Sequence, residues 1–159
     1  MYGGEFTFIN ALFESVSGFT TTGASILNDI EGLPPGLLFW RMSTAWMGGI
    51  GIVALFSLVL PPNSGNGAVL TGVEVSGIAR DDASTREKSL VKMMVTVYLS
   101  LTIIFIFTFR LCGMRWFDAV AHAMATVSTC GFSTKNASIL AFNSPLLEVV
   151  MSIFMLVSS

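Results

Sequence analysis

The chain contains apolar stretches of two lengths, and several of them end at glycine, proline or charged residues. The short stretch 7–18 ends at Gly18, and as a helix it would cover roughly half the thickness of a bilayer. The long stretch 37–60 carries no charged residue except Arg41, so it predicts a membrane-spanning helix. A half-length helix followed by a polar turn is typical of a re-entrant segment, whose non-helical backbone must be enclosed by protein or face water.

The second half of the chain repeats this order. Segment 61–89 is polar enough to lie outside the bilayer, and the capping-box sequence at 84–87 predicts the start of the next helix. That helix has its apolar part at 90–110, and a second half-length helix follows at 116–127. The last apolar stretch, 145–159, would reach roughly 22 Å as a helix, which is short of a hydrocarbon core of about 30 Å. We therefore expect this last inner helix to be partial.

A hydroxyl-rich turn with a glycine follows each half-length helix. The turn at 20–25 reads Thr-Thr-Thr-Gly-Ala-Ser, and the turn at 128–133 reads Ser-Thr-Cys-Gly-Phe-Ser, 108 positions later. An ion selectivity filter coordinates ions with backbone carbonyls, and glycine allows the backbone to turn those carbonyls into the pore. The pattern predicts an all-α polytopic membrane protein of membrane–pore–membrane repeats. We expect one pore unit at 1–60 and another at 90–159, with re-entrant half-helices and filter loops.

The composition agrees with a membrane protein. The chain is 53% hydrophobic and 11% charged, with a mean hydropathy of +0.75, whereas soluble domains carry about a quarter charged residues. The net charge of −2 says little, and the sequence has no basic patch that would suggest nucleic-acid binding. The two cysteines, Cys112 and Cys130, form no disulfide framework. Because no zinc spacing, nucleophile–base pair or phosphate loop occurs, we expect no enzyme.

Charge does not decide the orientation, because segment 61–92 and the opposite side of the predicted membrane carry four Lys or Arg residues each. Re-entrant filters of this type open to the outside of the cell. We therefore expect 61–89 to be a cytoplasmic loop.

Several motifs resemble the TrkH/KtrB/HKT superfamily of potassium uptake proteins, and the TrkH branch looks closest. These motifs are Phe-Glu-Ser-Val-Ser-Gly-Phe-Thr-Thr-Thr-Gly-Ala-Ser at 13–25, Phe-Trp-Arg at 39–41 and Trp-Met-Gly-Gly-Ile-Gly-Ile at 46–52. Ala-Ser-Ile at 137–139 and Asn-Ser-Pro at 143–145 are also similar to that branch. The resemblance covers essentially the whole chain.

The resemblance implies a subunit with four such units around one pore, of which this chain would be a fragment from the first filter to the second. It implies potassium transport with no cofactor, K⁺ being the transported ion, and no transition metal. The residues that it places in the filter, through their backbone carbonyls only, are Thr21, Thr22, Gly23, Thr129, Cys130 and Gly131. Within the family, serine at the first filter glycine goes with sodium preference, so glycine there favours K⁺.

The resemblance also implies partners and a location. The location is the plasma (cell inner) membrane, whose lipid bilayer the protein crosses several times. The partners are a second copy of the full-length protein, in a homodimer with one pore per subunit, and cytoplasmic nucleotide-binding regulatory subunits of the Trk/Ktr type.

An alternative is a truncated membrane protein without transport of its own, acting at most in assembly. A gene that continues past Ser159 into two more filter units would exclude this alternative. A tetrameric two-helix K⁺ channel is disfavoured, because neither filter reads Thr-Val-Gly-Tyr-Gly. Channel and symporter both stay open.

Other polar residues in the predicted membrane region have two interpretations each. Glu14 and His122 occupy equivalent positions in the half-helices, where a buried hydrogen-bonded support for the filter is favoured over electrostatic tuning or proton coupling. For Arg41 an interfacial arginine that holds a loop is favoured over a charge that repels cations or anchors a filter. For the glycines of 48–51 close helix packing is favoured over a hinge. Lys135 lies at the outer mouth or is solvated.

Overall fold

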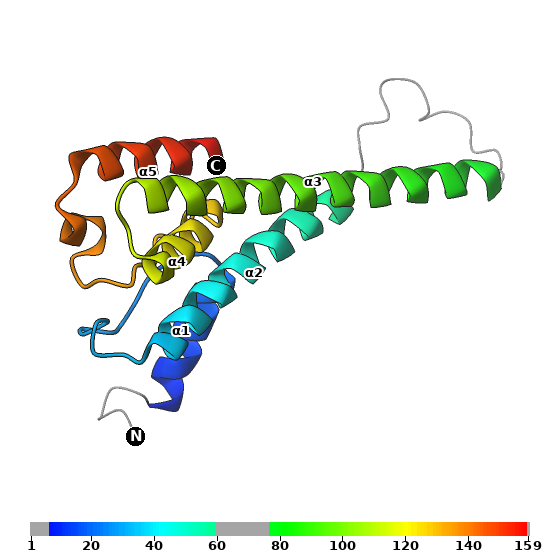
Figure 1. Ribbon diagram of the computed structural model, residues 1–159. Helices are drawn as coiled ribbons and strands as arrows, with labels where there is room; N and C mark the ends of the chain where they lie inside the picture. Colours follow the sequence, from blue (N-terminus) through cyan, green and yellow to red (C-terminus); the bar gives the residue numbers. More distant parts are fainter. Residues whose placement is uncertain (1–6, 60–76, 159) are drawn as a thin grey trace.

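The computed structural model describes residues 7–59 and 77–158, and in these residues the chain is helical, without strands. The helices follow one another as a short helix, two long helices, a second short helix, a 3-10 turn and a final helix (Figure 1). Their bounds are α1 Phe8–Phe19, α2 Pro35–Val59, α3 Gly77–Leu111, α4 Trp116–Val127, η1 Ser138–Phe142 and α5 Pro145–Ser158.

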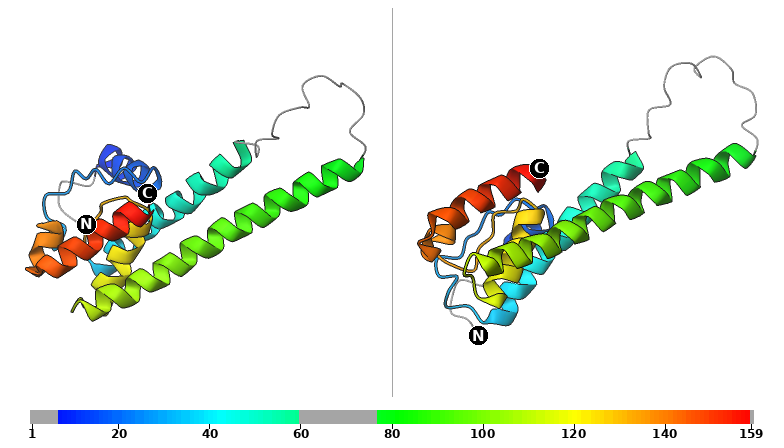
Figure 2. Two further views of the ribbon diagram at one scale, coloured as in Figure 1. Left: turned by 90° about the horizontal axis from the view of Figure 1, so that it is seen from above. Right: turned by 45° about the horizontal axis from the view of Figure 1, so that its top comes forward.

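The second short helix lies at the centre of the molecule. Helix α4 packs against α2, α3 and α5, whereas α1 packs against α2 (Figures 1 and 2). Helix α3 is the longest element and projects beyond the others. Helices α1 and α4 have 12 residues each, so each is roughly 18 Å long and cannot cross a bilayer.

Two apolar clusters hold α4 in place. One joins α4 to α3 and α5, and in it the Phe105 and Phe154 rings stack with their centroids 4.0 Å apart. The other joins α4 to α2 and to the turn after α4, and it includes Met42, Ala125 and Phe132. Nine residues of α4 are buried as a result. The second turn therefore starts from a helix that is fixed on several sides.

Glycines let α2 approach the neighbouring helices closely. A Cβ at Gly48 would overlap the carbonyl oxygen of Phe19 at the end of α1, and one at Gly49 would lie 3.1 Å from the Cβ of Ser128. A Cβ at Gly51 would meet no described atom within 4 Å apart from the backbone of its own helix. These contacts agree with close packing at Gly48 and Gly49 but give Gly51 no such role.

Helix α3 begins earlier than the sequence predicts. It starts at Gly77, and not at the capping box of 84–87, so that 77–89 of the expected loop is helical. This part contains no proline and several residues of high helix propensity, so the capping-box sequence lies inside the helix and does not start it. The remainder of the expected loop, 61–76, lies outside the described residues.

One stretch of the described residues, Val91–Leu111 of α3, is long and apolar enough to cross a membrane by length and composition. Only 11% of its apolar window is buried, so this stretch presents a broad apolar surface. Helix α2 has 25 residues and matches the expected span 37–60 to within two residues at each end. That α2 crosses the membrane stays a prediction.

Candidate functional site

The turns after α1 and α4 have the same backbone conformation. Thr21 and Gly23 lie in the left-handed region with φ of 55° and 73°, and their equivalents Thr129 and Gly131 have φ of 53° and 82°. A left-handed threonine is uncommon, because its branched side chain crowds the backbone. The chain therefore adopts the same costly conformation twice, at positions 108 residues apart.

Hydrogen bonds at the helix ends produce this conformation. The N–H of Thr21 donates to the Gly18 carbonyl at 2.9 Å, and that of Thr22 donates to the Ser17 carbonyl at 3.0 Å. These two bonds form a Schellman motif, in which a left-handed residue ends the helix. The same two bonds end α4, both at 3.0 Å, from Thr129 to Thr126 and from Cys130 to Ala125.

A carboxylate supports the backbone that leaves the first turn. Glu14 of α1 is buried, and its Oε1 accepts hydrogen bonds from Ser25 Oγ at 2.7 Å and from the Ile26 N–H at 2.8 Å. Ser25 Oγ in turn accepts the Leu27 N–H at 3.1 Å. The carboxylate thus orients the serine that lies two residues after Gly23.

An imidazole performs the same task after the second turn. His122 Nδ1 lies 2.8 Å from the Asp118 carbonyl, which can only accept, so Nδ1 carries the proton. Its Nε2 therefore accepts from Ser133 Oγ at 2.9 Å, and Ser133 Oγ accepts the Lys135 N–H at 3.1 Å. These contacts agree with the favoured interpretation of Glu14 and His122 as buried hydrogen-bonded supports.

The two turns lie against each other. A Cβ at Gly23 would overlap the carbonyl oxygen of Cys130, whereas no atom of the described part lies within 4 Å of a Cβ at Gly131. Thr21 and Thr129 border a shared cavity of about 620 Å³, to which α2, α3 and α5 also contribute. The structure thus brings the expected filter residues of both turns together, and it leaves the side of Gly131 open.

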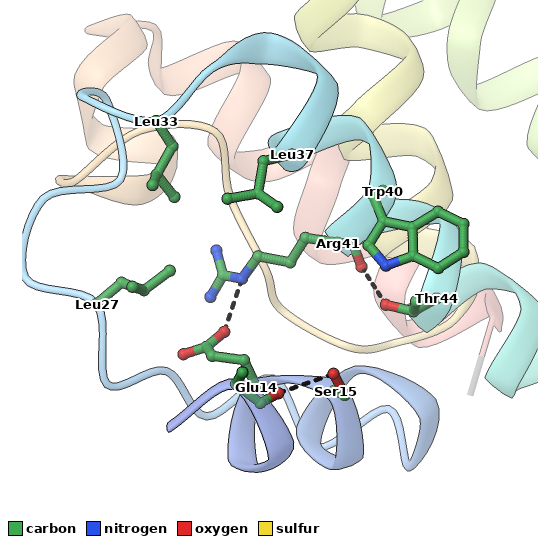
Figure 3. A pocket seen from close by; sticks show the side chains of 9 residues that line it. Glu14, Ser15, Leu27, Leu33, Leu37, Trp40, Arg41 and Thr44 are labelled. Atoms are coloured by element: carbon green, nitrogen blue, oxygen red, sulfur yellow. Dashed lines mark hydrogen bonds and ion pairs between the residues drawn. The ribbon is translucent and has the colours of Figure 1, made fainter. Parts of the chain in front are cut away.

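Arg41 of α2 contacts α1 and the turn after α4. It is 7% exposed, its Nε donates to Glu14 Oε2 at 3.0 Å, and its guanidinium carbon lies 3.7 Å from the centroid of the Phe132 ring. Its Nη1 has no hydrogen-bond partner among the described residues. The guanidinium points into a pocket of about 280 Å³ beside Leu27 and Leu33 (Figure 3). Arg41 is therefore buried between the surroundings of the two turns, and not the interfacial arginine that the sequence analysis favoured.

The loops beyond the two turns are also joined. Asn136 Oδ1 accepts the Ile30 N–H at 2.6 Å, and its Nδ2 donates to Asp29 Oδ1 at 3.0 Å. Lys135 Nζ lies 3.7 Å from Glu31 Oε2, with both side chains partly exposed. Lys135 is therefore half of an ion pair between the loops.

Comparison with protein families identifies the family of this chain. A family model described as "TrkH: Cation transport protein" matches residues 2–159. The chain belongs to the TrkH family. Its curated relatives include potassium uptake proteins of the Trk system.

The chain is 42% identical over 154 residues to the Trk system potassium uptake protein TrkG of Escherichia coli, covering 96% of the chain and 32% of that protein. To TrkH of Halomonas elongata it is 39% identical over 151 residues, covering 94% and 31%. The crystal structure of the potassium transporter TrkH from Vibrio parahaemolyticus matches with a TM-score of 0.76 and 34% identity, covering 96% of this chain and 29% of that one. The chain thus spans about a third of the length of these relatives.

In this TrkH-family chain, sequence reasoning missed two contacts that join the turns. One is Arg41 on Phe132, and the other is Asn136 with Asp29 and Ile30. The second contact joins residues that are 106 and 107 positions apart, so no local spacing could indicate it. For the first, the aromatic residue beside Gly131 and the single charge in 37–60 were visible, but their contact was not.

Proposed function

We propose that the chain is part of a Trk-type potassium uptake system and that its two turns are filter segments, which coordinate K⁺ through backbone carbonyls. The observation that carries the proposal is the repeated left-handed backbone of two turns that lie in contact. The coordinating residues would be Thr21, Thr22, Gly23, Thr129, Cys130 and Gly131.

The helices support this assignment electrostatically. Both α1 and α4 end directly before a filter segment, so their C-terminal ends, which carry about half a negative charge each, lie beside it. A cation that has lost its water gains from these dipoles and from a row of carbonyl oxygens. Such a site moves an ion and transforms no substrate, so the proposed role is transport and not catalysis.

The proposed pore needs more filter segments than the two adjoining ones of this chain. Two adjoining segments cover one part of an ion, and the open side at Gly131 leaves room for a further segment. We expect the complete protein to place four segments around the ion, in a multi-pass plasma-membrane homodimer with nucleotide-binding regulatory subunits. The 159-residue chain in liposomes should therefore carry no K⁺ flux down a K⁺ gradient. Selective flux that a Gly23 substitution abolishes would contradict this expectation.

Ion uptake by the complete gene product tests the proposed function. In cells that lack their own K⁺ uptake systems it should restore growth at low K⁺, and Gly23→Ser should raise Na⁺ uptake relative to K⁺. The added side chain would overlap the Cys130 carbonyl and strain a left-handed residue. Gly36→Ser is the matched control, because no described atom lies within 4 Å of a Cβ there and its φ is not left-handed. Equal K⁺/Na⁺ ratios in both variants would count against Gly23 as a filter residue.

Labelling tests the proposed orientation. A cysteine at Asn28, in the loop after the first filter segment, should react with an impermeant reagent added outside the cell, and one at Ser89 of α3 should not. Both positions are exposed, so access to the side of the membrane decides the result. Labelling of Ser89→Cys from outside the cell would show that the orientation is opposite to the proposed one.

A further inference from the structure

We propose that Arg41 is a positioning residue that couples the two filter segments and thereby sets their separation. This inference rests on the proposed function, because it assigns the buried arginine a part in ion selectivity. Among the described residues Arg41 donates no hydrogen bond to a carbonyl of the proposed filter; it acts through Glu14 on one side and Phe132 on the other.

On the first side the contact passes through Glu14. One carboxylate oxygen accepts from Arg41 Nε at 3.0 Å, and the other accepts from Ser25 Oγ and the Ile26 N–H at 2.7 and 2.8 Å. Ser25 and Ile26 are the second and third residues after Gly23. A movement of Arg41 would therefore shift the backbone that leaves the first segment.

On the second side the guanidinium lies over the Phe132 ring, 3.7 Å from its centroid. Phe132 directly follows Gly131 and is 3% exposed, so it has little freedom to move away. A guanidinium is planar and stacks on an aromatic face while it donates hydrogen bonds from its edge. A lysine offers a point charge in place of this planar group, so the geometry depends on arginine.

The two segments are packed too closely to absorb a change in the position of Arg41. Gly23 lies so close to the Cys130 carbonyl that it leaves no room for a Cβ. A shift of either segment therefore changes the spacing of carbonyls that would surround the ion, and this spacing and the carbonyl field govern the preference for K⁺ over Na⁺. His122, the support of the second segment, bonds within its own unit to Asp118 and Ser133. Of the two supports, only Glu14 is therefore linked through Arg41 to the other segment.

The transport test compares four variants in the complete protein. Arg41→Met removes the guanidinium, and Arg41→Lys keeps the charge without the planar group. Glu14→Gln with Arg41→Met removes both buried charges but keeps an amide oxygen as acceptor for Ser25. The control is Arg110→Met, which removes an exposed arginine of α3 that lies 5.4 Å from the Trp116 ring, away from the turns.

We expect the double variant and Arg41→Lys to fold and to take up ions. Their K⁺/Na⁺ uptake ratio should be about tenfold lower than that of the native protein, because a factor of this order corresponds to the loss of one charge-assisted hydrogen bond. Arg110→Met should leave the ratio unchanged. A wild-type ratio in the double variant would show that Arg41 only neutralises Glu14 and would overturn the inference. An equal fall in Arg110→Met would overturn it too, because the effect would not depend on the turns.

A second measurement separates this inference from the proposed function. In purified protein, Ser25→Ala and Phe132→Leu should lower the melting temperature non-additively, because Arg41 links the two sites. In the background of Glu14→Gln with Arg41→Met the two effects should add. Additive effects in the native background would overturn the coupling even if the protein takes up K⁺. Absence of K⁺ uptake by the native protein, with the non-additivity present, would overturn the proposed function alone.

Discussion

The turn after α1 is supported by a charged pair and the turn after α4 by a neutral histidine, while the backbone of the two turns is the same. Glu14 and His122 occupy equivalent positions, and each accepts a hydrogen bond from the serine two residues after the glycine of its turn. A carboxylate and an imidazole thus give the same backbone, because what the turn requires is an acceptor in this place. The chemical identity of that acceptor differs between the units.

Packing around the two half-helices differs even more. Helix α4 buries nine residues, and Phe105 and Phe109 of α3 belong to the cluster that covers it, whereas α1 buries three residues. On α1, Phe8 and Ile9 are exposed to 83% and 75%. Because the turns agree despite this difference, their conformation is set by local hydrogen bonds and not by the surrounding apolar contacts.

The largest effect should come from removing the acceptors. Glu14→Ala leaves the buried Arg41 guanidinium without its counter-charge, and breaking a buried pair in this way costs about 3–5 kcal/mol. His122→Ala leaves a neutral serine unpaired, which costs about 1–3 kcal/mol. Thermal unfolding of the purified protein should therefore rank Glu14→Ala as the less stable variant.

Glu148→Ala is the control for this ranking, because that carboxylate makes no hydrogen bond or ion pair among the described residues that would be lost. It should change the melting temperature little. Equal losses for Glu14→Ala and His122→Ala would show that the charge of the first support is solvated or otherwise compensated.

The glycines of the two turns should show a smaller difference in stability when each is replaced by alanine. Alanine at Gly23 or Gly131 must adopt a left-handed conformation, which costs about 1–2 kcal/mol in each case. At Gly23 the added Cβ also overlaps the Cys130 carbonyl, and such overpacking costs about 1–3 kcal/mol more. In the 159-residue chain Gly23→Ala should therefore unfold at the lower temperature. A larger loss for Gly131→Ala would mean that the open side at Gly131 is filled.

Much of this comparison was visible in the sequence, because the repeat itself aligns Gly23 with Gly131 and Glu14 with His122. The half-helix at 116–127 was visible for the same reason, since a glycine-ended turn closes a short apolar stretch. The early start of α3 was not, because a capping box is a local signal that a helix can run through. Contacts such as Arg41 with Phe132 depend on how α2 packs against the second turn, and no periodicity encodes that packing.

Replacing the equivalent serines of the two turns should lower the stability of the protein by equal amounts. Ser25→Ala and Ser133→Ala each remove a hydroxyl that donates to the support and accepts an N–H two residues later. Each should cost about 1 kcal/mol, the usual net value of such a bond. Chemical denaturation would measure both free energies of unfolding. A difference well above that size would show that the units do not share one hydrogen-bond arrangement.

The smallest expected effect concerns the link between the loops beyond the turns. The Asn136 amide, followed by the Gly32 N–H, holds the pKa of the exposed Asp29 carboxyl below its ordinary value. A carboxyl with a lowered pKa in the folded state stabilises fully above its unfolded pKa of about 3.9, and this contribution is lost as the pH falls through the lower folded value. Melting temperatures of the native chain should therefore fall slightly more below about pH 4 than those of Asp29→Asn, which has no such charge to lose. Asn136→Ala should reduce this excess as well, because it removes the largest cause of the shift. Parallel pH profiles for the native chain and Asp29→Asn would show that the loops are joined by the Asn136 contact to the Ile30 N–H and not by the carboxylate.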